Sequence, residues 1–166
     1  MTSRLKALPF VQAVWRSFRV ESGLEPRLLG DHFRITGAAP GKVEFELAIQ
    51  QQHTNRMTNI HGGTIASIVD LGGSLAVAST GRFSTGVSTD INVSYLSSGG
   101  KPGDVLKGLA TCDKIGKTLA YTSVQFWNSK GQLAARGSHT KYVVGTLKDQ
   151  SQAYEAPNEF VEDLEK

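Results

Sequence analysis

Alternation of apolar and polar positions predicts that the second half of the chain is rich in strands. Residues 43–49 and 87–95 alternate in this way, which is typical of half-buried β-strands. The same signals predict three more strands, over residues 104–113, 117–127 and 131–144. The turns that separate these three, at 114–116 and 128–131, are short, and short connections favour an antiparallel meander. Residues 37–41 (GAAPG) are predicted to form a turn before the first strand.

One long apolar segment, residues 64–80, interrupts the strands. It is too long for an ordinary strand and apolar on most sides, so it predicts a helix that is buried almost all round. Gly72 and Gly73 lie inside it and each lowers helix stability by roughly 1 kcal/mol relative to Ala. We expect such a cost where another backbone approaches closely. The order of elements lacks βαβ alternation and therefore predicts an α+β fold.

The two ends of the chain differ in charge. Residues 1–20 carry basic but no acidic side chains, and Val11, Val14 and Trp15 recur at helical spacing, which predicts a surface helix. A mitochondrial transit peptide is the alternative. Residues 148–166 are acidic and are predicted to be a mobile end. We therefore expect an N-terminal helical segment (1–25), one domain (26–146) and an acidic tail (147–166), in a cytoplasmic protein, with mitochondria as the alternative.

Composition removes several classes of function. The chain has 166 residues, enough for one domain with its own core. Its single cysteine, Cys112, excludes an internal disulfide and a cysteine-based zinc site, and the four histidines lack metal-ligand spacing. No apolar run is long enough to span a membrane. The net charge of +3 suits an anionic ligand, but is too small to indicate nucleic acid. We expect no metal and no cofactor.

Asp70 is the most informative single residue. It is the only charged residue between His61 and Thr80, in the middle of the predicted buried helix. Aspartate is almost never buried unless it is paired or functional, and a buried carboxylate is a stronger base at neutral pH. The alternatives are that Asp70 caps a helix broken at Gly72 and Gly73, or that it pairs with a distant arginine.

The sequence His61-Gly62-Gly63 stands at the start of the same helix. The first N–H groups of a helix have no internal partner and carry positive partial charge, and glycines would let a ligand oxygen reach them. The alternative is an ordinary glycine-rich turn. Nine residues separate His61 from Asp70, about 13.5 Å along a helix. Because this is too far for both to act on one carbonyl, we expect a site shared across a two-fold axis.

Basic side chains gather in the last predicted strands and turns. We expect some of them to meet phosphate groups, and a solvated polar face is the alternative of equal weight. They are Lys114, Lys117, Arg136, His139 and Lys141.

Several short segments together resemble the signature of hotdog-fold acyl-CoA thioesterases, in particular their small single-domain, PaaI-like branch. The resemblance covers residues 5–143. It rests on residues 53–55 (HTN), 59–63 (NIHGG), 69–70 (VD), 86–96 (GVSTDINVSYL), 116–124 (GKTLAYTSV) and 137–141 (GSHTK). It implies an antiparallel sheet wrapped around one long central helix. It also implies homodimers that pair into homotetramers, with active sites between subunits.

The resemblance further implies roles for individual residues. Asp70 would activate a water molecule or attack directly, and Asn55 and Gly62 would hold the thioester carbonyl. Ser88 would assist the water from the partner side. The substrate, acyl-CoA, would be bound by His61, Gly63, Ser88, Asp90, Tyr95, Leu96, Ser97, Ser98, Lys114, Ile115, Gly116, Lys117, Thr118, Leu119 and Tyr142.

Two other functions are compatible with this fold. One is a hydratase of enoyl thioesters, although such enzymes use a histidine–carboxylate pair and the predicted helix contains no histidine. The other is a protein that binds acyl-CoA without turnover, for which the carboxylate of Asp70 would be superfluous. The loop at 97–103 is one residue longer than in the family, which leaves the nucleotide contacts there open.

Overall fold

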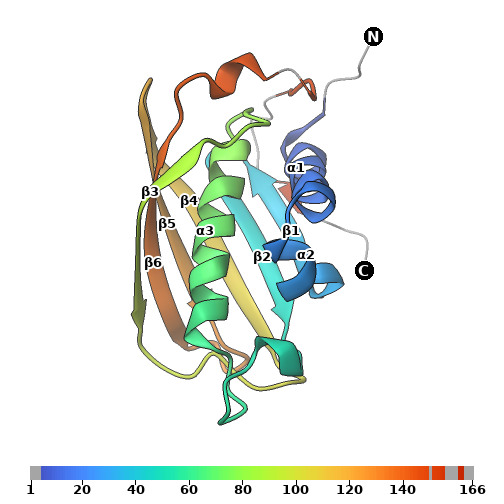
Figure 1. The fold of residues 1–166 in the computed structure, drawn as a ribbon, viewed down its shortest axis with the longest axis vertical. Coiled ribbons are helices and arrows are strands. Elements are labelled where there is room, and N and C mark those ends of the chain that lie inside the picture. Colours follow the sequence, from blue (N-terminus) through green and yellow to red (C-terminus); the bar gives the residue numbers. More distant parts are fainter. Residues whose placement is uncertain (1–4, 150, 156–160, 163–166) are drawn as a thin grey trace.

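In the computed structural model, which describes residues 5–149, 151–155 and 161–162, a curved antiparallel sheet wraps around one long helix (Figure 1). This confirms the predicted α+β hotdog fold. The helices are α1 (Ala7–Glu21), α2 (Leu24–Leu28) and the central α3 (Gly62–Ala78), with short 3₁₀ turns at Gly30–His32, Gln51–His53 and Thr146–Lys148. The strands are β1 (Phe33–Ala39), β2 (Lys42–Ala48), β3 (Val87–Tyr95), β4 (Val105–Ile115), β5 (Leu119–Trp127), β6 (Leu133–Tyr142) and β7 (Val161–Glu162).

The strands are arranged in the order β3-β6-β5-β4-β2-β1-β7. β4, β5 and β6 form the predicted meander, and β3 lies on the far side of β6, at one edge of the sheet.

Two boundaries were predicted wrongly. The turn between β4 and β5 lies at 116–118, two residues later than expected, and Gly37 to Ala39 belong to β1 instead of a turn. Small residues in β1 imitate a turn sequence, although Phe33 and Ile35 alternate into the core.

The core lies between α3 and the inner face of the sheet. The rings of Phe33, Phe45 and Phe126 contact one another there, with the centroids of Phe33 and Phe45 5.1 Å apart and those of Phe45 and Phe126 5.9 Å apart. α3 lies close to this layer, because a Cβ atom on Gly72 would stand 3.3 Å from Val124 and 3.4 Å from Ala110. The close approach expected at Gly72 is therefore to side chains of the same chain's sheet, and not to another backbone.

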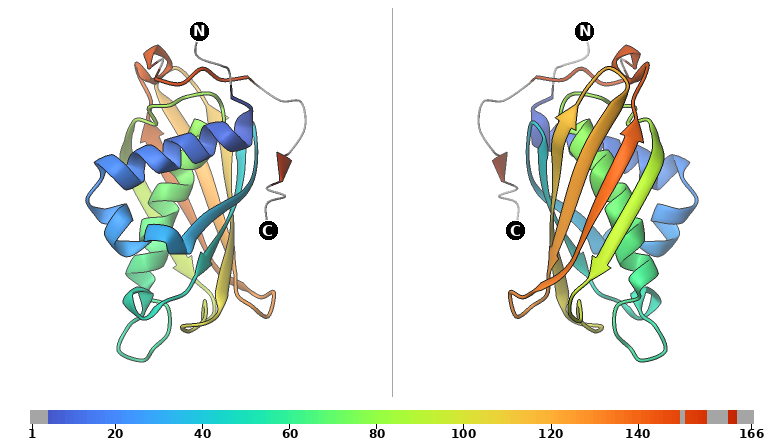
Figure 2. Two further views of the ribbon diagram at one scale, coloured as in Figure 1. Left: turned by 90° about the vertical axis from the view of Figure 1, so that its right-hand side faces the viewer. Right: turned by 90° about the vertical axis from the view of Figure 1, so that its left-hand side faces the viewer.

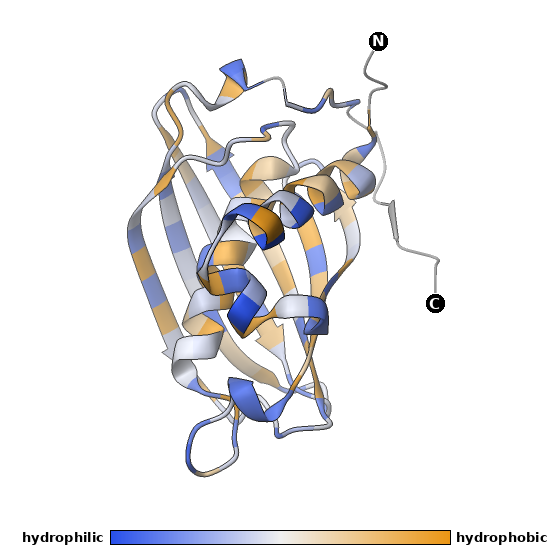
Figure 3. Cartoon of the chain, turned by 45° about the vertical axis from the view of Figure 1, so that its right-hand side comes forward, coloured by the Kyte–Doolittle hydropathy of each residue, from blue (hydrophilic) through white to orange (hydrophobic). Residues whose placement is uncertain are grey.

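The N-terminal helix α1 packs across the open side of α3, as the left view of Figure 2 shows. Its buried residues include Phe10, Val11, Val14 and Trp15, which confirms the predicted surface helix. Hydrophilic and hydrophobic residues alternate along the strands beneath it (Figure 3). Among the described helices, none is long and apolar enough to cross a bilayer.

The acidic C-terminal segment is not mobile at every position. The Tyr154 ring packs edge-on against Phe10, with centroids 4.8 Å apart, and its hydroxyl donates to the Ser79 carbonyl at 2.7 Å. β7 pairs with β1 at Gly37 and Ala38. The expectation of a mobile end was wrong for these residues, because Tyr154 is docked through its ring and hydroxyl and β7 is held by backbone pairing with β1.

Phe10→Ala tests whether α1 is part of the folded unit. Phe10 is fully buried and contacts the rings of both Phe83 and Tyr154, so its removal should lower the free energy of unfolding by about 3–5 kcal/mol. The control is Val20→Ala, which truncates a side chain that is 84% exposed on the same helix and should cost no more than about 0.5 kcal/mol. Equal urea midpoints for the two variants would show that α1 does not contribute to the core.

Candidate active site

Asp70 lies halfway along α3, on the stripe of the helix that faces β3. Its side chain is 52% exposed, so the expectation of a buried carboxylate was wrong for the single chain. The physical reason lies in the sheet order. The sheet and α1 cover the other sides of α3, whereas β3 is an edge strand with its residues largely exposed.

Ser88 and His139 meet Asp70 at this stripe. The Ser88 Oγ atom lies 3.4 Å from Asp70 Oδ1, and His139 Nε2 lies 2.8 Å from Ser88 Oγ and 3.6 Å from Asp70 Oδ1. Ser88 comes from β3, His139 from β6 and Asp70 from α3, all within one chain. We call these three residues the acid corner.

The hydrogen bonds of the acid corner follow from the chemistry of its groups. His139 Nδ1 is buried without a hydrogen-bond partner among the described residues. A proton on Nδ1 would therefore be an orphaned buried donor, which is rare in proteins. A proton on Nε2 is donated to Ser88 Oγ, and the Ser88 hydroxyl is then free to donate to Asp70 Oδ1. With the hydrogen bonds donated in this order, Asp70 Oδ1 is occupied by Ser88 and Oδ2 remains available to a ligand.

Gly73 is the reason that His139 fits beneath α3. A Cβ atom on this residue would stand 2.5 Å from His139 Nδ1 and 2.6 Å from Thr122 Oγ1, and real Cβ atoms do not approach so closely. As at Gly72, the space is taken by side chains of the chain's own sheet. The glycine in the helix therefore positions the histidine of the acid corner.

Lys141 also lies beneath α3. Its side chain is buried, and its ammonium group donates a hydrogen bond to Ser74 Oγ at 2.9 Å. Burial lowers the pKa of Lys141, and the charge of Asp70 acts in the opposite direction. Burial likewise lowers the pKa of His139, and the positive charge of Lys141 lowers it further, against the opposing effect of Asp70.

This placement corrects the prediction of a basic edge. Lys114, Lys117 and Arg136 are exposed, as a phosphate contact requires, but His139 and Lys141 point inward and cannot serve there. The sequence contains a signal for this. Positions 135, 137, 139, 141 and 143 share one face of the strand, and the apolar Ala135 and Val143 mark that face as the buried one.

The second half of the site lies at the start of α3. His61 caps the helix, because its Nδ1 accepts the N–H of Gly63 at 2.8 Å. The neighbouring N–H of Gly62 has no hydrogen-bond partner within the part of the chain that the structure describes. A helix N-terminus carries partial positive charge, so this amide is a preorganised donor for a developing oxyanion.

Asn55 stands in the loop before α3 with its side chain held in one orientation. Its Oδ1 accepts the N–H groups of Met57 at 2.9 Å and Asn59 at 3.3 Å. Its Nδ2 group is therefore the end that remains for a ligand, and it can only donate. The loop closes through an Asn55 N–H to Asn59 C=O hydrogen bond of 2.8 Å.

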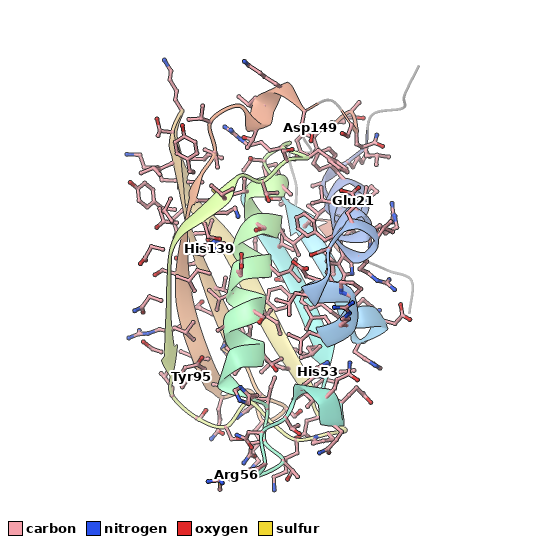
Figure 4. The ribbon with its side chains drawn as sticks, viewed as in Figure 1. Glu21, His53, Arg56, Tyr95, His139 and Asp149 are labelled. Carbon is pink, nitrogen blue, oxygen red and sulfur yellow. The ribbon has the colours of Figure 1, made fainter. Side chains whose placement is uncertain are left out.

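Tyr95 fixes the position of Gly62. Its hydroxyl donates to the Gly62 carbonyl at 2.7 Å, and its ring would stand 3.2 Å from a Cβ atom at that position. We call Gly62 and Asn55 the donor pair, and Tyr95 lies behind Gly62. Figure 4 shows that Tyr95 lies at the lower end of α3, whereas His139 lies well above it.

The residues expected to bind CoA divide in the same way. One group surrounds the start of α3 and comprises His61, Gly63, Tyr95, Leu96, Ser97 and Ser98. The other group lies at the opposite end of β3, where Ser88 is in register with Lys141, and Tyr142 pairs with both Val87 and Leu119. It comprises Ser88, Asp90, Lys114, Ile115, Gly116, Lys117, Thr118, Leu119 and Tyr142. One chain does not bring the two groups together.

Comparison with known proteins gives one consistent family. The profile of the thioesterase superfamily matches residues 57–135. Human acyl-coenzyme A thioesterase 13 is 42% identical over 118 residues, which cover 70% of this chain and 83% of that protein. The crystal structure of mouse thioesterase superfamily member 2 is 36% identical, with a TM-score of 0.71, over 80% of this chain and 96% of that one. A hypothetical thioesterase protein from Streptococcus pneumoniae, solved with coenzyme A, is 26% identical, with a TM-score of 0.63, over 68% and 88% of the two chains.

Two buried histidines should make stability depend on pH. His53 accepts the Gln50 N–H and lies 2.7 Å from the Leu28 carbonyl, and burial is the main cause that lowers its pKa, as it is for His139. Because the pKa values of both are lowered in the fold, the unfolded chain binds more protons than the folded chain as the pH falls through the ordinary histidine value of 6.5. The part of the free energy of unfolding that depends on these two neutral histidines should be present above that pH and lost progressively below it. Chemical denaturation between about pH 7.5 and pH 5.5 measures the loss. A free energy of unfolding that stayed constant over that range would contradict it.

Proposed function

Because the chain belongs to the thioesterase superfamily, we propose that it hydrolyses acyl-CoA thioesters to a free carboxylate and CoA. The observation that carries the proposal is the presence of two complementary half-sites. The donor pair can polarise a thioester carbonyl, and the acid corner can activate water. The coenzyme A in the related Streptococcus pneumoniae structure supports acyl-CoA as the ligand.

The reaction requires water to add to the carbonyl carbon and the C–S bond to break. The Gly62 N–H and the Asn55 Nδ2 group donate to the carbonyl oxygen and stabilise the oxyanion that forms there. Asp70 takes the proton of the attacking water, while Ser88 holds Oδ1 and leaves Oδ2 directed at the water. The tetrahedral intermediate then expels CoA as a thiolate, which takes up the proton. Of the two roles open to Asp70, the general base is the one we propose.

The two half-sites need two copies of the chain. Gly62 and Asp70 are eight residues apart on α3, about 12 Å along the helix. Tyr95 marks the donor pair and Ser88 marks the acid corner, and they lie at opposite ends of β3. Antiparallel pairing of two β3 strands about a two-fold axis brings Ser88 of one chain beside Tyr95 of the other. The axis then falls between Ile91 and Asn92, and two complete sites form.

β3 is suited to such pairing. It is a sheet edge, and the apolar residues Val87, Ile91 and Tyr95 are exposed on it. An edge of this kind offers unpaired backbone groups to a second strand. We further propose that these dimers pair into tetramers. CoA would then lie across the dimer, with the exposed Lys114 and Lys117 of one chain near its phosphates and Tyr95 to Ser98 of the other along its length.

Asp70→Asn tests the acid corner. The amide retains an oxygen to accept from Ser88, so the fold should remain intact, but it cannot take a proton from water. We expect kcat to fall by about 10²–10⁴-fold on the best acyl-CoA, followed by release of free thiol. Near wild-type turnover would exclude Asp70 as the base. Bound acyl-CoA without turnover in the wild-type protein would instead identify a binding protein, and hydration of an enoyl-CoA without thiol release would identify a hydratase.

Mixing two inactive variants tests the shared site. Asn55→Asp keeps an acceptor for the loop amides but loses the Nδ2 donor, and Asp70→Asn disables the other half. Random reassociation of equal amounts should make about half of the dimers mixed, each with one intact site and one doubly damaged site. Activity should therefore reappear after subunit exchange. Mixtures that have demonstrably exchanged subunits and remain inactive would disprove a site built from two chains.

A further inference from the structure

Lys141 is a buried cation that the proposed chemistry does not use. Only 3% of its surface is exposed, and Ser74 Oγ is the one hydrogen-bond partner that the described residues provide. Lysine is almost never fully buried without a partner charge, and replacing buried charges with apolar groups of similar volume is often stabilising. The stability of the fold therefore does not explain this residue.

The position of Lys141 relates it to each member of the acid corner. Ser74, its partner, follows Asp70 by one helical turn, so the two lie on the same face of α3. His139 precedes Lys141 by two residues on β6 and shares its inward face. Ser88 is directly opposite Lys141 in the β3–β6 register. The ammonium group thus lies behind the corner, on the side away from solvent.

Few other charges act on this region. Among the residues that the structure describes, Asp70 is the charged group that acts on the pKa of Lys141, and Asp70 and Lys141 are the charged groups that act on the pKa of His139. β5 contributes Ala120 and Thr122 opposite Lys141 and His139, neither of which titrates. On β3, Asp90 is paired with Thr140 and therefore lies on the outer side of the sheet. On β4, Cys112 is opposite Thr122 and packs beside Val77 and Ala120.

We propose, on the basis of the proposed function, that Lys141 is a positioning residue whose buried positive charge, held behind the acid corner by Ser74, prevents His139 from acquiring a second positive charge and so preserves the hydrogen bonds that run from His139 through Ser88 to Asp70. Two cations in one buried region repel each other, so the positive charge of Lys141 disfavours an imidazolium at His139.

The neutral state of His139 matters for the direction of the hydrogen bonds. A neutral imidazole with its proton on Nε2 donates to Ser88, and Ser88 donates to Asp70 Oδ1. An imidazolium 3.6 Å from Asp70 would form an ion pair with it and make the carboxylate a weaker base. A neutral His139 forms no such ion pair and keeps the Ser88 hydroxyl directed at Asp70.

Lys141→Met separates this role from a structural one, because methionine has a similar volume and no charge. We expect kcat to fall by about ten- to a hundredfold, by analogy with the groups that orient the ligands of metal sites from behind. KM for acyl-CoA should not change, and the melting temperature should stay the same or rise. Lys141→Arg should retain part of the activity. Lys107→Met is the matched control, since Lys107 is an exposed lysine on β4 that should affect neither quantity.

The titration of His139, followed by NMR without substrate, tests the charge effect independently of turnover. Lys141→Met should raise the pKa of His139 relative to the wild-type protein, and Lys107→Met should leave it unchanged. If the wild-type protein hydrolyses no acyl-CoA, the proposed function fails while this measurement still decides whether Lys141 controls the protonation of His139.

Three results would overturn the proposal. The first is a His139 titration that is the same with and without Lys141. The second is a joint fall of kcat and melting temperature with an unshifted titration, which would indicate a structural lysine. The third is a rise in KM alone, which would indicate a direct contact with CoA. If Lys141→Met does not fold, the kinetics, the melting temperature and the His139 titration are measured on Lys141→Gln instead.

Discussion

The close packing of α3 against the sheet at Gly72 and Gly73 is the constraint on which the rest of the structure depends. The two glycines weaken the helix by roughly 1 kcal/mol each relative to alanine. In return, the sheet's side chains occupy the space of the missing Cβ atoms, and at Gly73 that space is filled by His139 and Thr122. The acid corner exists because this histidine can lie under the helix. A helix held farther from the sheet would leave Asp70 without Ser88 and His139 at its side.

The two edges of the sheet differ in a way that is consistent with assembly. At the β1 edge, β7 pairs with Gly37 and Ala38 and covers part of the strand. At the β3 edge, the described residues provide no covering strand, and β3 contains neither lysine nor proline, the residues that commonly protect an edge from pairing. The proposed dimer covers this edge and places the two half-sites side by side. If the proposed dimer forms, the eight-residue separation of Gly62 and Asp70 is bridged by the pairing that also covers the open edge.

Local pattern was enough to predict the central helix, the meander and the N-terminal helix, because each follows from the periodicity of its own residues. The pattern at Asp70 misled, since burial depends on what covers a helix, and β3 covers that stripe only as an edge strand. Charge alone indicated that His139 and Lys141 could lie at a phosphate-binding edge, whereas their alternate positions on β6 place them on its inward face. Their contacts with Ser88 and Ser74 join residues 51 and 67 positions apart, which no local pattern encodes. Tyr154 was missed for the same reason.

The acid corner holds groups that oppose the stability of the fold. A neutral histidine with an unpartnered Nδ1 and a buried lysine both carry a desolvation cost, and Asp70 compensates only in part because half of its side chain faces solvent. Solvent also screens the attraction between Asp70 and Lys141. Exclusion of water from this stripe strengthens that attraction, since the Coulomb energy rises as the effective dielectric constant falls. In the proposed dimer, the second β3 strand excludes water from this stripe. Assembly would therefore strengthen the attraction between Asp70 and Lys141 and also bring the residues of both half-sites together.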